Sequence, residues 1–358
     1  MRRKDEPAMA SIQDVAKAAG VSPITVSRVM RDGTNVRPAT RDRVLRAAAD
    51  LNYVPNAVAR SLRQARSGLL ALIITDMMNP LFYAMARGAE AAAQAAGIAV
   101  VLGNSDDDAA LEAKYLRVMA EHRVDGIILV PTPSTTGAHF PPLPDKVPLV
   151  LLDRRPPDLA ASLVCCDSGS ATRDLCRHLF ALGHERIAIV GGMPEVSTWR
   201  ERVDGYRRAL REARRPSRDE IVLHGDYRAD GGRAAVRTLL AMTKPPDAIV
   251  AASAQVLYGV LDALAALGKT VPGDVSVSCL DDPALPSFVR PRFTYVAQPG
   301  YEMGAAAVAA VLAVLEANET TAADRVFPAS LRFGESCREQ WPANADAADA
   351  PASLRAAV

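Results

Sequence analysis

The first fifty residues alternate apolar and polar positions at the spacing of short helices. The pattern predicts one helix that begins at a Ser11 cap and ends at Gly20, and a second that runs from Pro23 to Met30 after a short turn. A third helix is expected from about Pro38 to Leu51. The positions that would share a core are Ile12, Val15, Ala16, Ala19, Val26, Val29, Met30, Val44, Leu45, Ala48 and Leu51. Three short helices of this kind make a small all-α head.

Beyond residue 68 the pattern changes to short apolar runs that alternate with helical segments. The runs are Leu69–Thr75, Val100–Gly103, Gly126–Val130, Leu149–Leu152, Leu163–Cys166, Ile187–Val190, Ile221–Leu223, Ala248–Ala251 and Val275–Leu280. The helical segments are Phe82–Ala96, Ala109–His122, Ala171–Ala181, Arg200–Glu212, Gly231–Ala241 and Gln255–Leu267, followed by a helix at Tyr301–Glu316 and a strand at Ala329–Phe333. Such alternation predicts parallel sheets wound on both faces. Because nine strands are many for one open sheet, we expect two α/β lobes of four or five strands each, joined near residues 153–167.

These elements divide the chain into five parts. Residues 1–9 form an N-terminal extension, residues 10–55 the helical head, and residues 56–67 a hinge and linker. The two-lobed body spans residues 68–340, and the low-complexity residues 341–358 are expected to be a disordered tail. The stretch from Asn56 to Leu62 has room for one or two helical turns, which are marginal in isolation.

Composition and charge narrow the class of protein. Apolar residues make up 49% of the chain and charged residues 23%, as in ordinary globular proteins. The longest apolar run, from Met303 to Leu315, is shorter than the roughly 20 residues of a membrane span, and the N-terminus has no apolar signal core. We therefore expect a cytoplasmic protein without a membrane segment. The five cysteines form no CxxC pair, so neither a disulfide framework nor a zinc site is expected.

The positive charge is concentrated at one end of the chain. Residues 1–67 hold 13 Lys and Arg against 6 Asp and Glu, although the whole chain has a net charge of only +1. Attraction to phosphates dominates the affinity of proteins for DNA, so a basic head on an acidic body is typical of a DNA-binding protein. The second helix adds to this picture because Ile24, Thr25, Ser27 and Arg28 face outward on it, as on a helix-turn-helix recognition helix. By itself, a pair of helices joined by a glycine turn has ordinary helical packing as its more common alternative.

Motifs of catalysis are incomplete. Gly268-Lys269-Thr270 lacks the first glycine of a phosphate-binding loop and closes a helix instead of opening one. Asp106-Asp107-Asp108 precedes a helix and is interpreted as a helix cap, not as a metal cluster. Asp281-Asp282 ends a strand, where open α/β sheets bind ligands. No set of acid, base and nucleophile can be assembled, so we expect no enzyme, no cofactor and no metal.

Longer segments of the chain resemble the lactose-repressor (LacI/GalR) family of transcriptional regulators. The resemblance rests on these segments: Ile12–Ala16, Gly20–Val29, Thr40–Val44, Asn52–Leu62, Asn79–Phe82, Arg123–Leu129, Leu182–Ala188, Val271–Val277 and Gln298–Gly304. It covers about residues 10–338. It implies a homodimer that binds a near-palindromic operator in double-stranded DNA, with the helix from Pro23 to Met30 in the major groove. Because the tetramerising leucine heptad of some relatives is absent after Trp341, we expect a dimer.

The same resemblance implies which residues contact DNA. In such proteins the hinge helices pair and a leucine, here Leu62, wedges into the minor groove beside a small residue, here Ala59, which bends the duplex. Arg31, Arg37, Arg41 and Arg60 are expected at the phosphates. The full set of implied DNA contacts is Ser11, Ser22, Pro23, Ile24, Thr25, Ser27, Arg28, Arg31, Asn35, Asn56, Ala59, Arg60 and Leu62.

The body resembles periplasmic sugar-binding lobes, whose ligand lies in the cleft between them. The resemblance implies that Leu81 and Phe82 wall the cleft, Asp153 and Asp281 accept hydrogen bonds, Arg202 grips the ligand, Tyr227 stacks on it and Ser253 lines the site. These residue types suit a sugar, a sugar acid or a related metabolite. For Arg202 and Tyr227, a solvated helix face and a core position are the alternatives.

Some positions depart from the family's pattern. Ser253-Ala254 stands where Asn-Asp is usual, Leu280 replaces an aromatic residue, and Arg31 and Arg37 stand where neutral polar residues are usual. The effector site is therefore atypical, with a ligand that is smaller, more anionic or not a standard sugar. Two other functions stay open: a sugar-binding α/β protein whose basic head is incidental, and a regulator that binds DNA without an effector.

Overall fold

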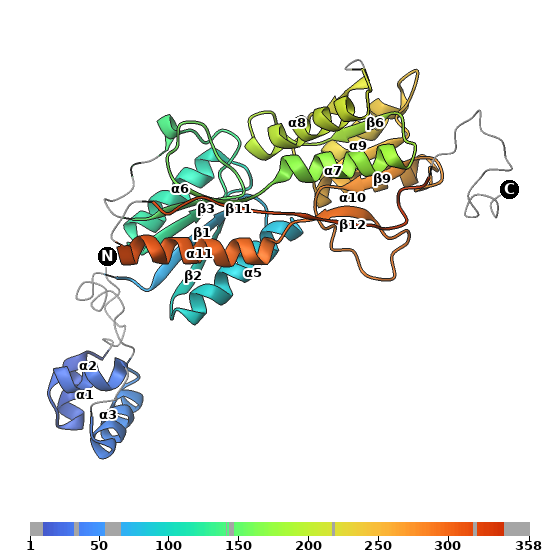
Figure 1. Cartoon of the computed structure of the whole chain (residues 1–358). Helices are drawn as coiled ribbons and strands as arrows, with labels where there is room; N and C mark the ends of the chain where they lie inside the picture. Colours follow the sequence, from blue (N-terminus) through green and yellow to red (C-terminus); the bar gives the residue numbers. More distant parts are fainter. Residues whose placement is uncertain are drawn as a thin grey trace, which may run out of the picture. The chain divides into compact units, whose positions relative to one another are not determined.

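The computed structural model describes residues 10–31, 36–53, 66–140, 142, 147–216, 219–317 and 321–339. The chain divides into two compact units, one up to Ser67 and one from Gly68 onward (Figure 1). The predicted extension, most of the hinge and the tail lie outside the described residues. Each unit has its own hydrophobic core.

The described residues of the first unit form three helices, α1 (Ile12–Ala19), α2 (Pro23–Arg31) and α3 (Pro38–Asp50). The predicted Ser11 cap at the start of α1 is confirmed, and with Asp14 it forms a capping box: Asp14 N donates to Ser11 Oγ at 3.3 Å, and Ser11 N donates to Asp14 Oδ2 at 2.8 Å. The three helices bury one small core made of Val15, Ala16, Ala19, Val26, Val29, Val44, Ala47 and Ala48. Leu45 and Leu51, which were predicted to face this core, are exposed, because the inward stripe of α3 runs through Val44, Ala47 and Ala48.

The second unit contains two α/β lobes. The sheet of the first lobe has the order β11-β5-β4-β3-β1-β2, and that of the second lobe β12-β10-β9-β8-β6-β7. The strands are β1 (Leu69–Ile74), β2 (Ala99–Asn104), β3 (Gly126–Leu129), β4 (Leu149–Leu152), β5 (Ser162–Cys166), β6 (Ile187–Val190), β7 (Ile221–Leu223), β8 (Ala248–Ala251), β9 (Ser276–Cys279), β10 (Thr294–Ala297), β11 (Arg325–Phe327) and β12 (Ser330–Arg332). All pairings are parallel except that of β10 with β12. The prediction of a small all-α head and a two-lobed body with parallel sheets is confirmed.

The predicted four or five strands per lobe are wrong, since the described residues form six strands in each sheet. Strands β10 and β11 were missed. Their apolar runs are short: β10 alternates buried and half-buried positions, and β11 is an exposed edge strand. These late strands complete both sheets, so the chain passes between the lobes three times, after β5, after β10 and between β11 and β12 (Figure 1).

Helices cover the faces of both sheets. They are α5 (Pro80–Ala95), α6 (Ala109–Glu121), α7 (Ser168–Ala181), α8 (Ser197–Glu212), α9 (Ala229–Leu240), α10 (Ala254–Ala266) and α11 (Gly300–Ala317), with a short 3-10 turn at Gly137–His139. Helix α7 starts three residues earlier than predicted, because the Asp167 carboxylate caps a Ser-Gly-Ser stretch that has low helix propensity by itself.

Helix α11 belongs to the first lobe, although it follows the second lobe in sequence. It crosses α5 at such short range that a Cβ at Gly88 would collide with the backbone of Tyr301, and one at Gly304 with that of Met85. Among the described residues, α11 is the one helix long and apolar enough to span a membrane, but it packs into the first lobe through Met303, Val308 and Val311. It is a core helix of this lobe.

Candidate functional site

The head presents a helix-turn-helix. Gly20 ends α1 in the left-handed conformation, with φ of 61°, and its N–H donates to Lys17 O at 3.3 Å. Two residues later, Ser22 Oγ accepts from Thr25 N at 3.2 Å and starts α2. A tight turn between a left-handed glycine and a serine cap holds α2 at a defined angle to α1, and Val26 and Val29 bury its inner face.

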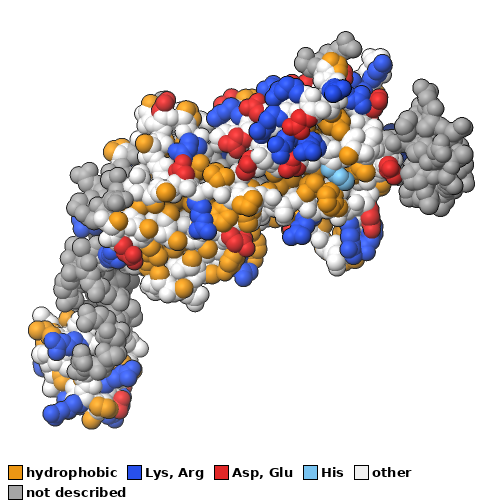
Figure 2. All heavy atoms as spheres, viewed as in Figure 1, with side chains coloured by type: hydrophobic (Ala, Val, Ile, Leu, Met, Phe, Trp, Pro, Cys, Tyr) orange, Lys and Arg blue, Asp and Glu red, His pale blue; other side chains and the backbone are white. Residues whose placement is uncertain are grey.

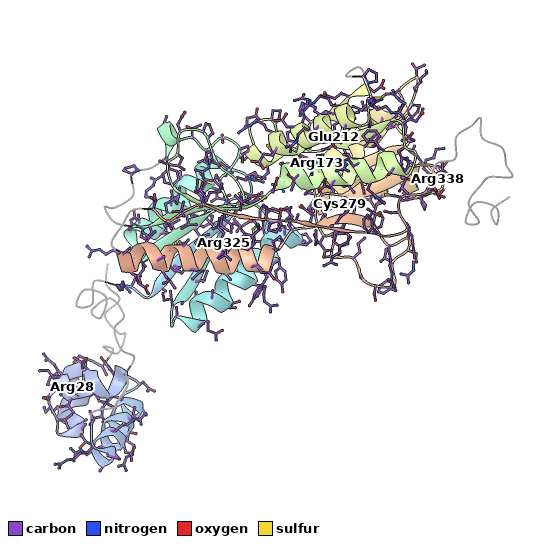
Figure 3. The ribbon with its side chains drawn as sticks, in the orientation of Figure 1. Arg28, Arg173, Glu212, Cys279, Arg325 and Arg338 are labelled. Atoms are coloured by element: carbon purple, nitrogen blue, oxygen red, sulfur yellow. The ribbon has the colours of Figure 1, made fainter. Side chains whose placement is uncertain are left out.

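The outer face of α2 carries the residues predicted to contact bases. Ile24 is 67% exposed, more than the other exposed large hydrophobic side chains described in the head, Leu45 and Leu51. Arg28 is exposed too, and Figure 3 shows it on the surface of the head, while Thr25 and Ser27 are half-buried. An apolar group and a guanidinium on one helix face suit the methyl group of thymine and the acceptors of guanine or phosphate. Contact of these residues with DNA stays a prediction.

Several predicted DNA contacts cannot be placed. Asn35, Asn56, Ala59, Arg60 and Leu62 lie outside the described residues. Arg31 is the last residue of α2, and Pro23 is the first. The hydroxyl groups of Ser11 and Ser22 are both engaged locally, with Asp14 Oδ2 at 2.7 Å and with Thr25 Oγ1 at 3.0 Å.

A second candidate site lies between the two lobes of the body. Thr75, Asp153, Tyr227, Ser253 and Asp281 each follow a parallel strand, so the strand ends of both lobes face one cleft. All seven predicted effector residues line this single cavity, together with Thr75, Asp76, Asn79, Asp107, Arg154, Thr198, Asp226 and Arg228. Their role as ligand contacts stays a prediction, since no ligand is present.

Arg202 is the central cation on the side of the second lobe. Its side chain is buried, with 4% of the residue exposed, so the alternative of a solvated helix face is wrong. The guanidinium donates to Ala252 O and, at 3.4 Å, to Asp281 Oδ1, to which Gln298 also donates at 2.5 Å. These contacts hold the guanidinium of Arg202 in place beside Asp281 in the cleft.

The two carboxylates predicted as acceptors are both buried in the cleft. Burial raises the pKa of Asp281 to about 6, although the Arg202 charge opposes this shift. Burial also raises the pKa of Asp153, against the charges of Arg154 and Arg202. Asp153 Oδ1 has no hydrogen-bond partner among the described residues. A buried carboxylate oxygen without a partner is a strong acceptor for a ligand donor.

Ser253 lines the cleft but serves the protein backbone. Its Oγ accepts from Val256 N at 3.3 Å as the cap of α10 and lies 3.3 Å from Tyr227 O, to which it donates. The hydroxyl therefore also holds Tyr227, and the ligand contact predicted for Ser253 stays a prediction.

Sequence reasoning missed Arg154 and Asp107. The interpretation of the Asp106-Asp107-Asp108 run as a helix cap holds for Asp108, which caps α6, but Asp107 accepts from Arg154 Nη1 at 2.9 Å and Asp106 from Arg228 Nη2 at 2.8 Å. A helix needs only one capping residue, so a run of three acidic residues before α6 indicates that the other two have a different role.

Unusual backbone conformations gather at this cleft. Four non-glycine residues around it, Asp106, Asp107, Asp153 and Tyr227, have positive φ angles between 54° and 68°. A left-handed tyrosine is uncommon, and such conformations concentrate at functional sites. Within the described residues no group of three or more His, Cys, Asp or Glu side chains is placed to hold a metal ion.

Comparison with known families matches both units. Residues 11–56 match the family described as bacterial regulatory proteins, lacI family. Residues 176–337 match a periplasmic binding protein-like domain.

Proteins of similar sequence are transcriptional regulators. The chain is 34% identical to catabolite control protein A of Priestia megaterium, over 92% of this chain and 99% of the relative. It is 28% identical to the transcriptional repressor CytR of Escherichia coli K12, over 94% of this chain and 99% of that one. It is 33% identical to the ribose operon repressor of Halalkalibacterium halodurans, over 86% and 91%.

Solved structures agree with these relatives. The lac repressor dimer bound to operator and an anti-inducer superimposes with a TM-score of 0.75 and 26% identity, over 92% of this chain and 99% of that one. The CelR–cellobiose complex superimposes with a TM-score of 0.67 and 30% identity, over 91% and 99%. A helix-turn-helix head, a two-lobed body with a polar cleft and relatives matched over nearly their whole length show that the chain belongs to the lacI family of bacterial regulatory proteins.

Proposed function

We propose that the protein is a transcriptional repressor that binds a near-palindromic operator as a homodimer and responds to a small polar ligand in the cleft between its lobes. The observation that carries the proposal is the combination of an exposed recognition face on α2 with a buried polar cleft in one chain. The relatives are named as regulators, which supports a function without catalysis.

Dimerisation is supported by the surface of the body. Large apolar side chains stay exposed there, among them Met78 at 76%, Tyr83 at 58% and Tyr301 at 47%. Figure 2 shows hydrophobic side chains spread over α5 and α11, whereas charged side chains of both signs gather over α7 and α8. A large exposed apolar patch marks a contact surface. The lac repressor relative is a dimer.

The ligand is proposed to be a sugar, a sugar acid or a related polar metabolite, in line with relatives solved with cellobiose and ribose. The cleft supports this class because it offers buried carboxylates, a buried arginine and the aromatic side chains of Phe82 and Tyr227. Ligand binding would change the angle of the lobes, and the marginal hinge between residues 56 and 67 would pass this change to the DNA.

The test is capture of genomic DNA fragments by the purified protein, followed by a salt titration on the best site. A palindrome of roughly 14 to 20 base pairs with a flexible centre is the expected result. Binding that depends on salt but not on sequence contradicts the proposal and indicates a generic basic module. A Leu62→Ala variant should lose operator affinity while the body stays folded, because the proposed minor-groove wedge is removed.

A regulator that binds DNA without an effector is a second candidate. It is favoured by the small size of the cavity, about 20 Å³. Thermal unfolding with candidate ligands separates the two, since a ligand at 100 times its Kd stabilises the folded protein by about 2.7 kcal/mol. If no metabolite of the regulated pathway stabilises the folded protein, the second candidate is favoured.

A further inference from the structure

The middle of the cleft is filled by a side chain of the protein itself. Arg154, which directly follows Asp153, is only 6% exposed. Its guanidinium carbon lies 5.8 Å from the centre of the Phe82 ring and 5.5 Å from that of the Tyr227 ring. Phe82 belongs to the first lobe and Tyr227 to the second, so Arg154 touches the aromatic groups of both lobes. Both distances are within the range of cation–π attraction.

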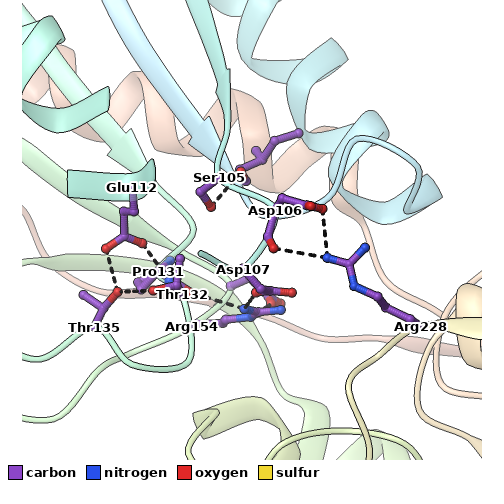
Figure 4. A network of polar contacts seen from close by, with 11 residues as sticks. Ser105, Asp106, Asp107, Glu112, Pro131, Thr132, Thr135, Arg154 and Arg228 are labelled. Atoms are coloured by element: carbon purple, nitrogen blue, oxygen red, sulfur yellow. Dashed lines mark hydrogen bonds and ion pairs between the residues drawn. The ribbon is translucent and has the colours of Figure 1, made fainter. Parts of the chain in front are cut away.

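The polar contacts of Arg154 complete a binding site for a cation. Nη1 donates to Asp107 Oδ1 at 2.9 Å and to Pro131 O at 3.1 Å (Figure 4). The Nε atom lies 3.7 Å from Asp153 Oδ2. Two carboxylates, one carbonyl oxygen and two aromatic rings surround one guanidinium. A positive charge removed from water needs this kind of environment.

The charge of the cleft favours a cation at this place. The cavity is lined by five aspartates but only three arginines, Arg154, Arg202 and Arg228. Arg202 is engaged with Asp281, and Arg228 with Asp106. When Arg154 leaves, Asp107 loses its 2.9 Å partner and Asp153 loses one of its two neighbouring cations.

A ligand has little room while Arg154 is in place. The remaining cavity is about 20 Å³, enough for a water molecule but not for a sugar ring. Four buried polar atoms of the residues around it, Thr75 Oγ1, Asp153 Oδ1, Arg154 Nε and Tyr227 Oη, have no hydrogen-bond partner among the described residues. Unpartnered buried atoms of this kind indicate a place for a ligand group.

We propose that the space between Phe82 and Tyr227 is a cation site that Arg154 occupies in the protein itself, and that Arg154 thereby determines which ligands the cleft admits. The inference rests on the effector cleft proposed above and narrows its ligand. A molecule that takes over this place brings a cationic nitrogen, such as an amine, an amidine or a guanidine, because Asp107 and Asp153 have to be neutralised when Arg154 leaves.

The test is titration calorimetry of the full chain with methylguanidinium and with N-methylurea, which has a similar shape and no charge. The Arg154→Ala variant opens the site, so it should bind methylguanidinium at least tenfold more tightly than the wild type does, and at least tenfold more tightly than it binds N-methylurea. The matched control is Arg154→Met, which fills the space without a charge and should bind neither probe.

Three results would overturn the proposal. A folded Arg154→Ala variant that binds neither probe, or both equally, shows that the place is not a cation site. Equal binding of methylguanidinium by Arg154→Met shows that the probe binds elsewhere. Saturable binding of ribose by the wild type with an affinity unchanged in Arg154→Ala shows that Arg154 does not control access.

A second variant covers the risk that Arg154→Ala does not fold with two unneutralised carboxylates. Arg154→Ala combined with Asp107→Asn leaves Asp153 and both rings in place, and it should still prefer methylguanidinium over N-methylurea. Equal binding by this folded variant overturns the proposal. Capture of operator DNA by the wild type tests the proposed regulatory function separately. A protein that captures no operator can still bind methylguanidinium in calorimetry, so the two hypotheses can fail independently.

Discussion

Arg228 in the second lobe binds Asp106 in the first lobe across the mouth of the cleft. Its Nη2 donates to the Asp106 carboxylate at 2.8 Å and to the Asp106 carbonyl oxygen at 3.1 Å (Figure 4). Gln255 Nε2 makes a second link by donating to Met78 O at 2.8 Å. These two links connect surfaces that a hinge motion would separate, so they stabilise the closed arrangement of the lobes.

Loss of the first link should favour opening. We predict that Arg228→Ala shifts the body toward an open form, by less than about 1 kcal/mol because the pair is partly exposed. Distance measurements between labels on the two lobes check this. The matched control is Arg233→Ala, since Arg233 pairs with Asp230 and Asp262 within one lobe. Equal distances in Arg228→Ala and the wild type would show that this link does not hold the cleft closed.

Arg202 should contribute to the stability of the folded protein in the absence of a ligand. Arg202→Ala removes the cation that faces Asp281 and leaves a buried carboxylate without its charge partner, which destabilises proteins by about 3 to 5 kcal/mol. Adding Asp281→Asn should recover part of this loss. Urea unfolding of the three proteins provides the measurement, and a double variant no more stable than Arg202→Ala argues against the pair as the cause.

The cleft should make stability depend on pH. Because burial raises the pKa of Asp281 to about 6, the folded state holds this proton more tightly than the unfolded state does. The resulting stability is present below about pH 4 and is lost as pH rises through about 6. Asp153 acts with the same sign. Unfolding free energies between pH 4 and 7 should therefore fall more steeply for the wild type than for Asp281→Asn, and parallel curves would exclude Asp281 as the source.

The capping box of α1 should stabilise the head. Ser11→Ala removes the hydroxyl that accepts from Asp14 N, a change that typically lowers helix stability by about 1 kcal/mol. Hydrogen exchange of the backbone amides of α1 in the full chain should then be roughly fivefold faster, while exchange in β1 stays constant. Unchanged exchange in α1 would mean that the cap contributes nothing measurable.

The exposed face of α2 should decide operator affinity. Arg28→Ala is expected to weaken binding to the selected operator by about 1 to 3 kcal/mol if Arg28 contacts a base, and to relax the sequence preference at one position. If Arg28 contacts only a phosphate, binding falls equally on all sequences and the salt dependence becomes shallower. Filter binding at several salt concentrations distinguishes the two, and an unchanged affinity places Arg28 away from DNA.

The head and the architecture of the body could be predicted because their signals are local. Caps, a glycine turn and helical spacing determine α1 and α2, and apolar runs mark buried strands such as β1 and β8. Strand β11 was missed, because its place at the edge of the first sheet depends on a partner far away in sequence, β5. Exposed edges have no apolar pattern to detect.

The cleft was predictable only in part, for a related reason. Asp153, Arg202 and Asp281 could be carried over because the resemblance aligns them with known positions. The place of Arg154 depends on the left-handed backbone of Asp107 and on two rings from separate lobes. Such a convergence is a property of the folded chain, and no sequence spacing indicates it.

The late return of α11 and β11 to the first lobe has a consequence for synthesis on the ribosome. The head holds all its core residues within about the first fifty positions, so it can fold as soon as it emerges. The first lobe lacks its edge strand and the helix that covers Gly88 until residue 327 has been made. Its apolar sheet is therefore unfinished for most of translation, and chaperones would meet this half of the nascent protein for longest.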